Sequence, residues 1–332
     1  MTGWDTALHS LPHLSLSPQP TPIVCADRVS AAIGGPRVWL KRDDLLPAAF
    51  GGNKVRALDI VAADALHRGA DTLVTGAGPL SNHVRASAAV AALAGLRCIA
   101  IYWGAPPTRI EGNHRLTRLL AADIRFTGDI DRASVDRGLE TAAAEIAERG
   151  GRPYKIPRGG ACALAALAHV LAVRETLDQC ADLGVMPQII VMAAGGGATL
   201  AGWLLGTSLY GANWKIEAIA VSRQAEETSV RVRSLAAQAA TLINAPFDVD
   251  DVEWIIHDGF IGADYGVPSS EGQKAIRMLA RTEGVFLDPI YTGKAMAGYL
   301  TLVAQGRYEG ISTVLFLHTG GLPTLFTSIS EV

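Results

Sequence analysis

Short apolar runs rich in β-branched residues alternate along this chain with stretches rich in alanine and leucine. A run such as Ile189-Ile190-Val191-Met192 is apolar at every position, which is typical of a parallel strand buried on both faces. A strand, a short loop and a helix in repetition predict right-handed parallel crossovers. The alternation therefore predicts an α/β protein with open parallel sheets.

Three stretches show this pattern most clearly. In the first we expect a strand at 71–75, a helix at 81–94 and a strand at 97–103. In the second we expect a strand at 188–193, a helix at 199–206 and a strand at 216–221. In the last we expect a strand at 313–318 and a helix at 323–329. At 332 residues the chain is long enough for two sub-domains. Residues 153–160 contain two prolines and two glycines, and we expect them to cross between the sub-domains.

Composition excludes several classes of protein. Apolar residues make up 49% and charged residues only 18%, so disorder is not expected, and a net charge of −3 gives no electrostatic basis for nucleic acid or an anionic membrane as partner. The four cysteines lack C-x-x-C spacing, which argues against a disulfide scaffold and a zinc site, and we expect no metal. Prolines at 12, 18, 20 and 22 predict an extended N-terminal arm, and no apolar run approaches the ~20 residues that span a bilayer. We therefore expect a cytoplasmic protein.

A glycine-rich loop, Gly195-Gly196-Gly197-Ala198-Thr199, lies between an expected strand and an expected helix. Glycines let backbone N–H groups approach a phosphate closely, and the positive end of the helix dipole adds to the attraction. Thr199 would cap that helix and donate its hydroxyl to the same anion. The alternative interpretation is a tight strand-to-helix turn without a ligand.

Lys54 follows an aromatic residue, two glycines and an asparagine in Phe50-Gly51-Gly52-Asn53-Lys54. A partly desolvated lysine offers its free amine to a carbonyl cofactor, whereas most lysines are solvated. The glycine-rich loop would hold the phosphate of the same cofactor. The two segments together suggest pyridoxal phosphate chemistry.

Three further segments carry candidate site residues; two of them follow expected strands and one, 288–294, is an expected loop. Ser81-Asn82-His83 opens a helix, where exposed backbone donors would receive a carboxylate, although Ser81 can also be a simple N-cap. Residues 288–294 contain a tyrosine and a threonine, and residues 318–321 contain two glycines at the end of the last expected strand. Either segment is also compatible with an ordinary turn. Strand ends of parallel α/β sheets collect around the ligand crevice.

From about Thr21 to Phe326, these segments, together with Lys41-Arg42-Asp43-Asp44, resemble the family of 1-aminocyclopropane-1-carboxylate deaminase and D-cysteine desulfhydrase. The resemblance implies a fold type II pyridoxal-phosphate enzyme, related to tryptophan synthase β, that forms a homodimer. We expect residues 1–55 and 158–332 to form the larger, cofactor-binding domain and residues 56–157 a smaller α/β domain.

The resemblance also implies roles for individual residues. Lys54 looks like the Schiff-base lysine and proton shuttle, and Asn82 like the residue beside the ring hydroxyl of the cofactor. Tyr291 and Ser81 look like further catalytic residues. Other cofactor contacts are implied for Gly195, Gly196, Gly197, Ala198, Thr199 and Thr319, and substrate contacts for Ser81, Asn82, His83, Phe260 and Tyr291.

Two positions favour one branch of the family. Thr292 and Thr319 stand where ring-opening deaminases usually carry Glu and Leu, and small hydroxyl residues are typical of the desulfhydrase branch. A carboxylate beside the pyridine nitrogen strengthens the ring as an electron sink more than a hydroxyl does. We therefore expect β-elimination from a small amino acid, giving a keto acid and ammonia. The alternatives are ring-opening deamination, β-replacement, and a non-catalytic protein that binds a phosphate ligand.

The sequence also departs from the family pattern at several expected pocket positions. Phe260 replaces a usual tyrosine and Leu80 a usual glutamine. Ala161 and Cys162 stand where Ser-Asn is common, and the loop has Gly196 and Ala198 where Ser and Gly are typical. These changes remove polar groups, and with Trp103 they would fit a less polar or larger amino acid.

Overall fold

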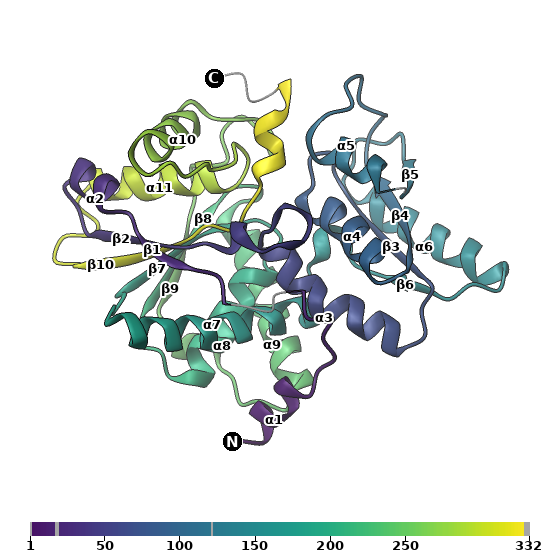
Figure 1. Cartoon of the computed structure of the whole chain (residues 1–332), viewed down its shortest axis with the longest axis horizontal. Coiled ribbons are helices and arrows are strands. Elements are labelled where there is room, and N and C mark those ends of the chain that lie inside the picture. Colours follow the sequence, from purple (N-terminus) through teal and green to yellow (C-terminus); the bar gives the residue numbers. More distant parts are fainter. Residues whose placement is uncertain (1, 17–19, 121, 329–332) are drawn as a thin grey trace.

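The computed structural model describes residues 2–16, 20–120 and 122–328, and it contains two sheets in separate lobes (Figure 1). The larger sheet has the strand order β1-β2-β10-β7-β8-β9 and the smaller one the order β5-β4-β3-β6. The strands of the larger sheet are β1 (Ile23–Cys25), β2 (Arg37–Lys41), β7 (Ile189–Ala194), β8 (Lys215–Ala220), β9 (Trp254–His257) and β10 (Thr313–Leu317). Those of the smaller sheet are β3 (Thr72–Ala77), β4 (Arg97–Tyr102), β5 (Asp123–Phe126) and β6 (Pro153–Lys155).

Neighbouring strands are parallel throughout both sheets, except for the antiparallel pair β1 and β2 at one edge of the larger sheet. The predicted parallel α/β class is therefore confirmed. The run Ile189-Ile190-Val191-Met192 forms most of β7, and all four side chains are buried. Burial on both faces explains why this strand is apolar at every position.

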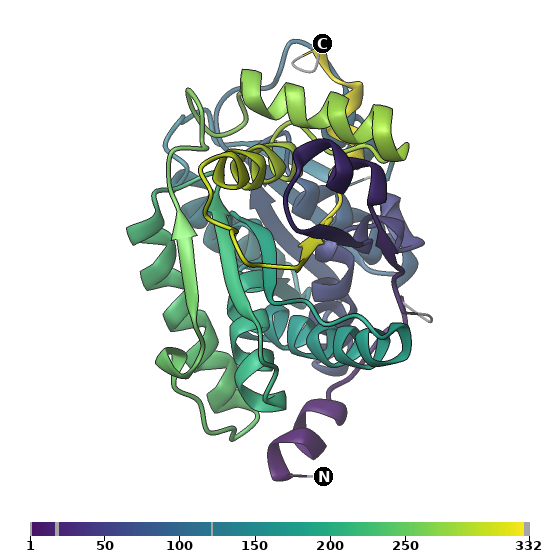
Figure 2. The same ribbon diagram turned by 90° about the vertical axis from the view of Figure 1, so that its left-hand side faces the viewer.

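Helices cover both faces of the larger sheet (Figures 1 and 2). On one face lie α7 (Ala163–Leu183), α8 (Ala198–Tyr210) and α9 (Ala225–Leu242), and on the other α2 (Asp27–Ile33), α10 (Ser270–Glu283) and α11 (Thr292–Ala304). Alternate residues of β10 supply the two cores: Leu315 and Leu317 pack with α7 and α8, whereas Val314 and Phe316 pack with α10 and α11. This is the period of two expected for a strand between two helical layers.

The smaller lobe repeats this arrangement on a smaller scale. Its helices are α4 (Asn82–Leu93), α5 (Gly112–Leu119) and α6 (Ser134–Glu148). Val74 and Ile101 of the sheet pack against α6, and Ala77 and Tyr102 belong to the core on the α4 side. Helix α3 (Asn53–His67) contacts both α7 of the larger lobe and α4 of the smaller one, so it lies where the two lobes meet.

Most expected elements are present, but the C-terminal end differs from expectation and one helix that was not expected lies near the N-terminus. The segment at 323–329 forms a short 3-10 helix, η5 (Leu322–Phe326), and residue 329 lies outside the described residues. Residues before the expected N-terminal arm form a helix, α1 (Gly3–His9), while residue 18 lies outside the described part. The remaining 3-10 turns are η1 (Asp43–Leu45), η2 (Ala48–Phe50), η3 (Arg158–Gly160) and η4 (Val249–Asp251).

Residues 153–160 lie between the two lobes along the chain. They contain β6, the edge strand of the smaller sheet, and η3, and α7 then packs against α8 on the larger sheet. The domain limits at 55–56 and 157–158 stay a prediction. Among the described residues, the segment Arg158–Leu183, which contains α7, is long and apolar enough to cross a membrane. Most of it is buried inside the protein, as in the core helix of a globular fold.

Candidate active site

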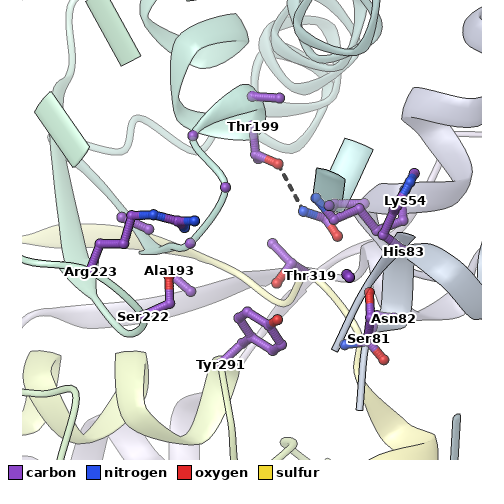
Figure 3. Close-up of a pocket in the computed structure, with 18 of the residues that line it drawn as sticks. Lys54, Ser81, Asn82, His83, Ala193, Thr199, Ser222, Arg223, Tyr291 and Thr319 are labelled. Carbon is purple, nitrogen blue, oxygen red and sulfur yellow. Dashed lines mark hydrogen bonds between the residues drawn. The ribbon is translucent and has the colours of Figure 1, made fainter. Parts of the chain in front are cut away.

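A cavity lies between the two lobes, with about 980 Å³ of space outside protein atoms, part of it open to solvent. Its wall includes residues at or just beyond the ends of β3, β7, β8 and β10. Figure 3 shows side chains from both lobes converging on it. Of the residues expected in the site, those lining the cavity are Lys54, Ser81, Asn82, His83, Gly195, Gly196, Gly197, Ala198, Thr199, Tyr291 and Thr319.

Phe260 is the expected substrate residue that the structure does not place in the cavity wall. Its side chain is partly buried and packs against the core formed by α10, α11 and the larger sheet. Tyr265, five residues further along the same loop, lines the cavity instead. The loss of a hydroxyl at Phe260 therefore does not alter the cavity wall directly, and a contact of Phe260 with the substrate stays a prediction.

Two glycines bring Lys54 to the cavity. Gly51 and Gly52 have φ values of +66° and +102°, and a Cβ on Gly52 would lie 2.8 Å from the backbone oxygen of Thr319. The backbone N–H of Asn53 donates to that same oxygen at 3.1 Å. Only residues without a side chain allow α3 to begin so close to the end of β10. Helix α3 thus presents Lys54 in its first turn.

Burial lowers the pKa of Lys54 from 10.5 to about 8. Desolvation is the main cause, the charge of Arg231 lowers the pKa further, and Cys162 opposes the change. About a tenth of the amine is therefore unprotonated at pH 7, and a nucleophilic lysine requires this free form. The interpretation of Lys54 as a solvated surface lysine does not fit this position.

The glycine-rich loop forms the start of α8. Gly197, at φ +96°, is its N-cap residue, so the expectation that Thr199 caps this helix is wrong. The hydroxyl of Thr199 instead accepts from Asn53 Nδ2 at 2.8 Å (dashed line at Thr199 in Figure 3). It also lies 3.2 Å from His169 Nε2. When His169 carries its proton on Nε2, the hydroxyl hydrogen of Thr199 remains available to an anion in the loop. Backbone N–H groups in the first turn of a helix have no intrahelical acceptor and are available to the same anion.

The charged side chains that line the cavity are all basic among the described residues. Besides Lys54, its lining includes Arg132, Arg158, Arg223 and Arg231, whereas no Asp or Glu lines it among the described residues. Three of these arginines pair with acids near the cavity, at 2.8–3.1 Å. Arg231 differs: its Nε donates to the backbone oxygen of Gly196 at 3.1 Å, and no carboxylate within the described residues pairs with it. Burial and the charges of Arg223 and Arg158 lower its pKa. An anion beside the glycine loop would neutralise this charge.

Ser81, Asn82 and His83 enter the cavity from the smaller lobe. The Ser81 hydroxyl accepts from the backbone N–H of Val84 at 3.3 Å, so it caps α4 as the simpler interpretation predicted. His83 Nε2 lies 2.7 Å from Thr75 Oγ1, and burial lowers its pKa to about 3, which keeps the ring neutral. A Cβ on Gly160 would lie 2.4 Å from His83 Nδ1, so the glycine lets the ring lie against the crossing segment.

Two tyrosines meet on the other side of the cavity. The hydroxyls of Tyr291 and Tyr265 are 2.6 Å apart. Burial raises the pKa of both, that of Tyr291 well above 10. Lys294 donates to the backbone oxygens of Ile261 and Asp264 and so holds the loop that carries Tyr265. The pair remains protonated near neutral pH and can pass or share a proton between its hydroxyls.

Thr292 and Thr319 differ in their access to the cavity. Thr319 lines it, at the end of β10. Thr292 is fully buried and does not line it, and its hydroxyl donates to Asp288 Oδ1 at 2.7 Å. Any influence of Thr292 on a ligand is therefore indirect.

These groups fit a ligand that combines an aldehyde with a phosphate. The glycine loop and Arg231 would hold the phosphate, Lys54 would take the aldehyde, and the Asn82 side chain would lie beside the ring. Ser222 Oγ, in the same wall, is buried without a hydrogen-bond partner within the described residues, as expected for a polar atom that a ligand completes. The fold and the cavity together define a fold type II pyridoxal-phosphate enzyme.

Comparison with known proteins agrees with this class. Residues 14–320 match the family described as "Pyridoxal-phosphate dependent enzyme", and the chain belongs to that family. It is 39% identical over 327 residues to the D-cysteine desulfhydrases of Salmonella choleraesuis (strain SC-B67) and Salmonella paratyphi C (strain RKS4594), covering 96% of this chain and 98% of each relative. The expected enzyme class, lyase, and the expected cofactor, pyridoxal phosphate, are thereby confirmed.

Solved structures give the same result for the fold. A structure described as an ACC deaminase homologue superposes with a TM-score of 0.90 at 33% identity, covering 98% of this chain and 97% of that one. The structure of O-ureido-L-serine synthase superposes with a TM-score of 0.66 at 19% identity, which supports the fold alone.

The cavity residues that the sequence did not indicate include Tyr265, Arg231 and Arg132. Tyr265 had a usable signal, because it precedes Gly266-Val267-Pro268 in a loop. Arg231 lies within α9 and Arg132 in the loop before α6, and neither belongs to a glycine-rich or strand-end motif. No pattern in the sequence distinguishes these two arginines from solvated ones.

Proposed function

We propose that this protein is a pyridoxal-phosphate-dependent lyase that eliminates the β-substituent of a small amino acid, with D-cysteine as the first candidate substrate. The observation that carries the proposal is one cavity in which the low-pKa amine of Lys54 and the Tyr265–Tyr291 hydroxyl pair lie together with an anion-binding loop. The names of the desulfhydrase relatives support the choice of substrate.

The bound cofactor supplies an electron sink that stabilises negative charge at the substrate Cα. Lys54 Nζ removes the Cα proton, because its lowered pKa leaves part of the amine free. The N-terminus of α4, capped by Ser81, binds and orients the substrate carboxylate through its backbone N–H groups. The Tyr291 hydroxyl, held by Tyr265, donates a hydrogen bond to the leaving group.

Elimination is favoured over ring opening by the charge of the cavity. Opening a carbon ring needs more electron withdrawal than expelling a thiolate, and a carboxylate beside the pyridine nitrogen would supply it. In the described part of the chain no Asp or Glu lines the cavity, and Thr319 offers only a hydroxyl. Ring-opening deamination is the second candidate, because the superposed structure is described as an ACC deaminase homologue.

The test is incubation of the purified holoenzyme with D-cysteine, L-cysteine and 1-aminocyclopropane-1-carboxylate in parallel. Sulfide, a three-carbon keto acid and ammonia in equal amounts from D-cysteine would support the proposal. A four-carbon keto acid from the cyclic substrate alone would replace it with the deaminase. Capture of an added thiol with no keto acid would indicate β-replacement. A Lys54→Ala control should abolish every product.

A non-catalytic role, the oligomeric state and the cellular location can each be tested. A non-catalytic role would be indicated if the protein bound the cofactor and released no product from any of these amino acids. A homodimer is expected from the family resemblance, and light scattering would give twice the 34.8 kDa chain mass. A cytoplasmic location without membrane or nucleic-acid partners is expected, and fractionation of cells expressing the protein would test it.

A further inference from the structure

Asn113 is a fully buried amide on α5 that contacts the active site without lining it. Its exposed fraction is 0%, and it is absent from the cavity wall. Its Nδ2 donates two hydrogen bonds, one to the backbone oxygen of Leu80 and one to Asn82 Oδ1, both at 2.8 Å. Asn82, by contrast, does line the cavity.

These two bonds determine the orientation of both amides. The backbone oxygen of Leu80 can only accept, so the NH2 group of Asn113 must face it. The same NH2 group then requires an acceptor from Asn82, which turns Asn82 Oδ1 toward Asn113. The NH2 group of Asn82 is left for the cavity. A side-chain amide could otherwise take either of two orientations of similar energy.

The oxygen of the Asn113 side chain does not stabilise the fold. Its Oδ1 is buried and has no hydrogen-bond partner within the described residues. A buried acceptor without a partner is costly, by roughly 1–3 kcal/mol. Local choices that oppose stability are expected where function requires them. This asymmetry indicates that the position is occupied for its two donors.

The start of α5 is held in place by the C-terminal segment. Glu111 Oε1 accepts from the backbone N–H and the hydroxyl of Ser328, at 2.9 and 2.6 Å. Gly112 has φ +52°, and a Cβ there would lie 2.4 Å from a methyl carbon of Thr327. The helix that carries Asn113 is therefore fixed against a segment that follows the last strand of the larger sheet. A fixed helix gives Asn113 a defined position relative to Asn82.

We propose that Asn113 is a positioning residue that holds the Asn82 amide with its NH2 group toward the cofactor ring. The inference rests on the proposed function for the placement of Asn82 beside the ring hydroxyl, where a donor is required once the oxygen is ionised. A buried amide thus acts on the cofactor through a second amide, without touching it. Supporting groups of this kind preorganise a site.

The test compares the holoenzyme with four single variants, one of them Asn82→Ala, and with the double variant Asn82→Ala/Asn113→Ala. Asn113→Ala removes both donors, and Asn113→Asp keeps the shape but presents oxygens to two acceptors. Thr117→Val is the matched control, because Thr117 is fully buried on the same helix and bonds to Tyr102 Oη and to the backbone of Asn113. The readouts are the dissociation constant for pyridoxal phosphate, the visible absorption maximum of the bound cofactor and the melting temperature.

We expect Asn113→Ala to weaken cofactor binding about tenfold, or about 1.4 kcal/mol, and to change the absorption maximum. Asn82→Ala should do the same, and Asn82→Ala/Asn113→Ala should be no worse than Asn82→Ala alone, because the second residue acts through the first. Asn113→Asp should resemble Asn113→Ala and supplies the comparison where the alanine variant does not fold. Thr117→Val should lower only the melting temperature.

Additive losses in the double variant would overturn the proposal. So would Asn113 variants that lower the melting temperature as Thr117→Val does while leaving affinity and spectrum unchanged. None of these readouts depends on turnover. Failure of the proposed β-elimination would therefore appear in the product assays, with the cofactor measurements intact.

Discussion

Replacing Lys54 by methionine should stabilise the cofactor-free protein at neutral pH. A fall in pKa from 10.5 to about 8, at 1.36 kcal/mol for each pKa unit, corresponds to about 3 kcal/mol of unfavourable free energy in the folded state. The cost is fully present below pH 8, where the lysine is protonated whether the chain is folded or unfolded. It declines as pH rises from 8 to 10.5, because the folded protein then binds fewer protons than the unfolded chain.

The assay is urea unfolding of wild type and Lys54→Met after removal of the cofactor, at pH 7 and at pH 9.5. The gain in unfolding free energy from loss of the charge should be about 3 kcal/mol at pH 7 and about 1.4 kcal/mol at pH 9.5. The added methionine packing is the same at both pH values and cancels in the difference. Lys274→Met, at an exposed position on α10, serves as the control for a change of net charge.

An advantage of Lys54→Met that is equal at pH 7 and pH 9.5 would refute the desolvation of Lys54. So would a pH dependence matched by Lys274→Met. In either case the amine of Lys54 would be solvated, and only the family resemblance would support a reactive lysine at this position.

Three further outcomes are expected. Tyr265→Phe removes the hydrogen bond to Tyr291 and should lower kcat about tenfold with the cofactor spectrum unchanged, and an equal loss of cofactor binding would contradict the assignment. Arg231→Gln should weaken pyridoxal phosphate binding about tenfold in a titration of cofactor-free protein, because it removes an unpaired charge beside the glycine loop. Glu217 accepts hydrogen bonds from three side chains and has a pKa lowered to about 2, so Glu217→Gln should cost about 3 kcal/mol at pH 7. That cost should disappear as pH falls from 4.5 to 2, and a constant difference would contradict the shifted pKa.

The parts of the site predicted from the sequence are those that depend on backbone geometry. Gly51 and Gly52 permit an approach that no other residue allows, and the glycine loop opens a helix, so both leave a local mark on the sequence. The parallel strands are recognisable for a similar reason, because burial on both faces makes them apolar throughout.

The features of the site that could not be predicted from the sequence depend on contacts between side chains far apart in the chain. Thr199 was expected as a cap, but Asn53, 146 positions away in the chain, engages its hydroxyl. Phe260 and Tyr265 occupy one irregular loop, where no periodicity indicates which ring faces the cavity. Arg231 contacts the loop from a helix that follows it by about 30 residues. Such partners are determined only when the chain has folded.

The division of the site between two lobes has a thermodynamic consequence. In the proposed site, the contacts to the phosphate come from the larger lobe, Lys54 comes from α3 where the lobes meet, and Asn82 and its neighbours contribute from the smaller lobe. One small molecule then contacts both lobes, which also share an apolar core that includes residues of β3, α4, α7 and α8. Whatever binds only the folded form stabilises it by mass action, so loading with cofactor should raise the melting temperature of the two lobes together.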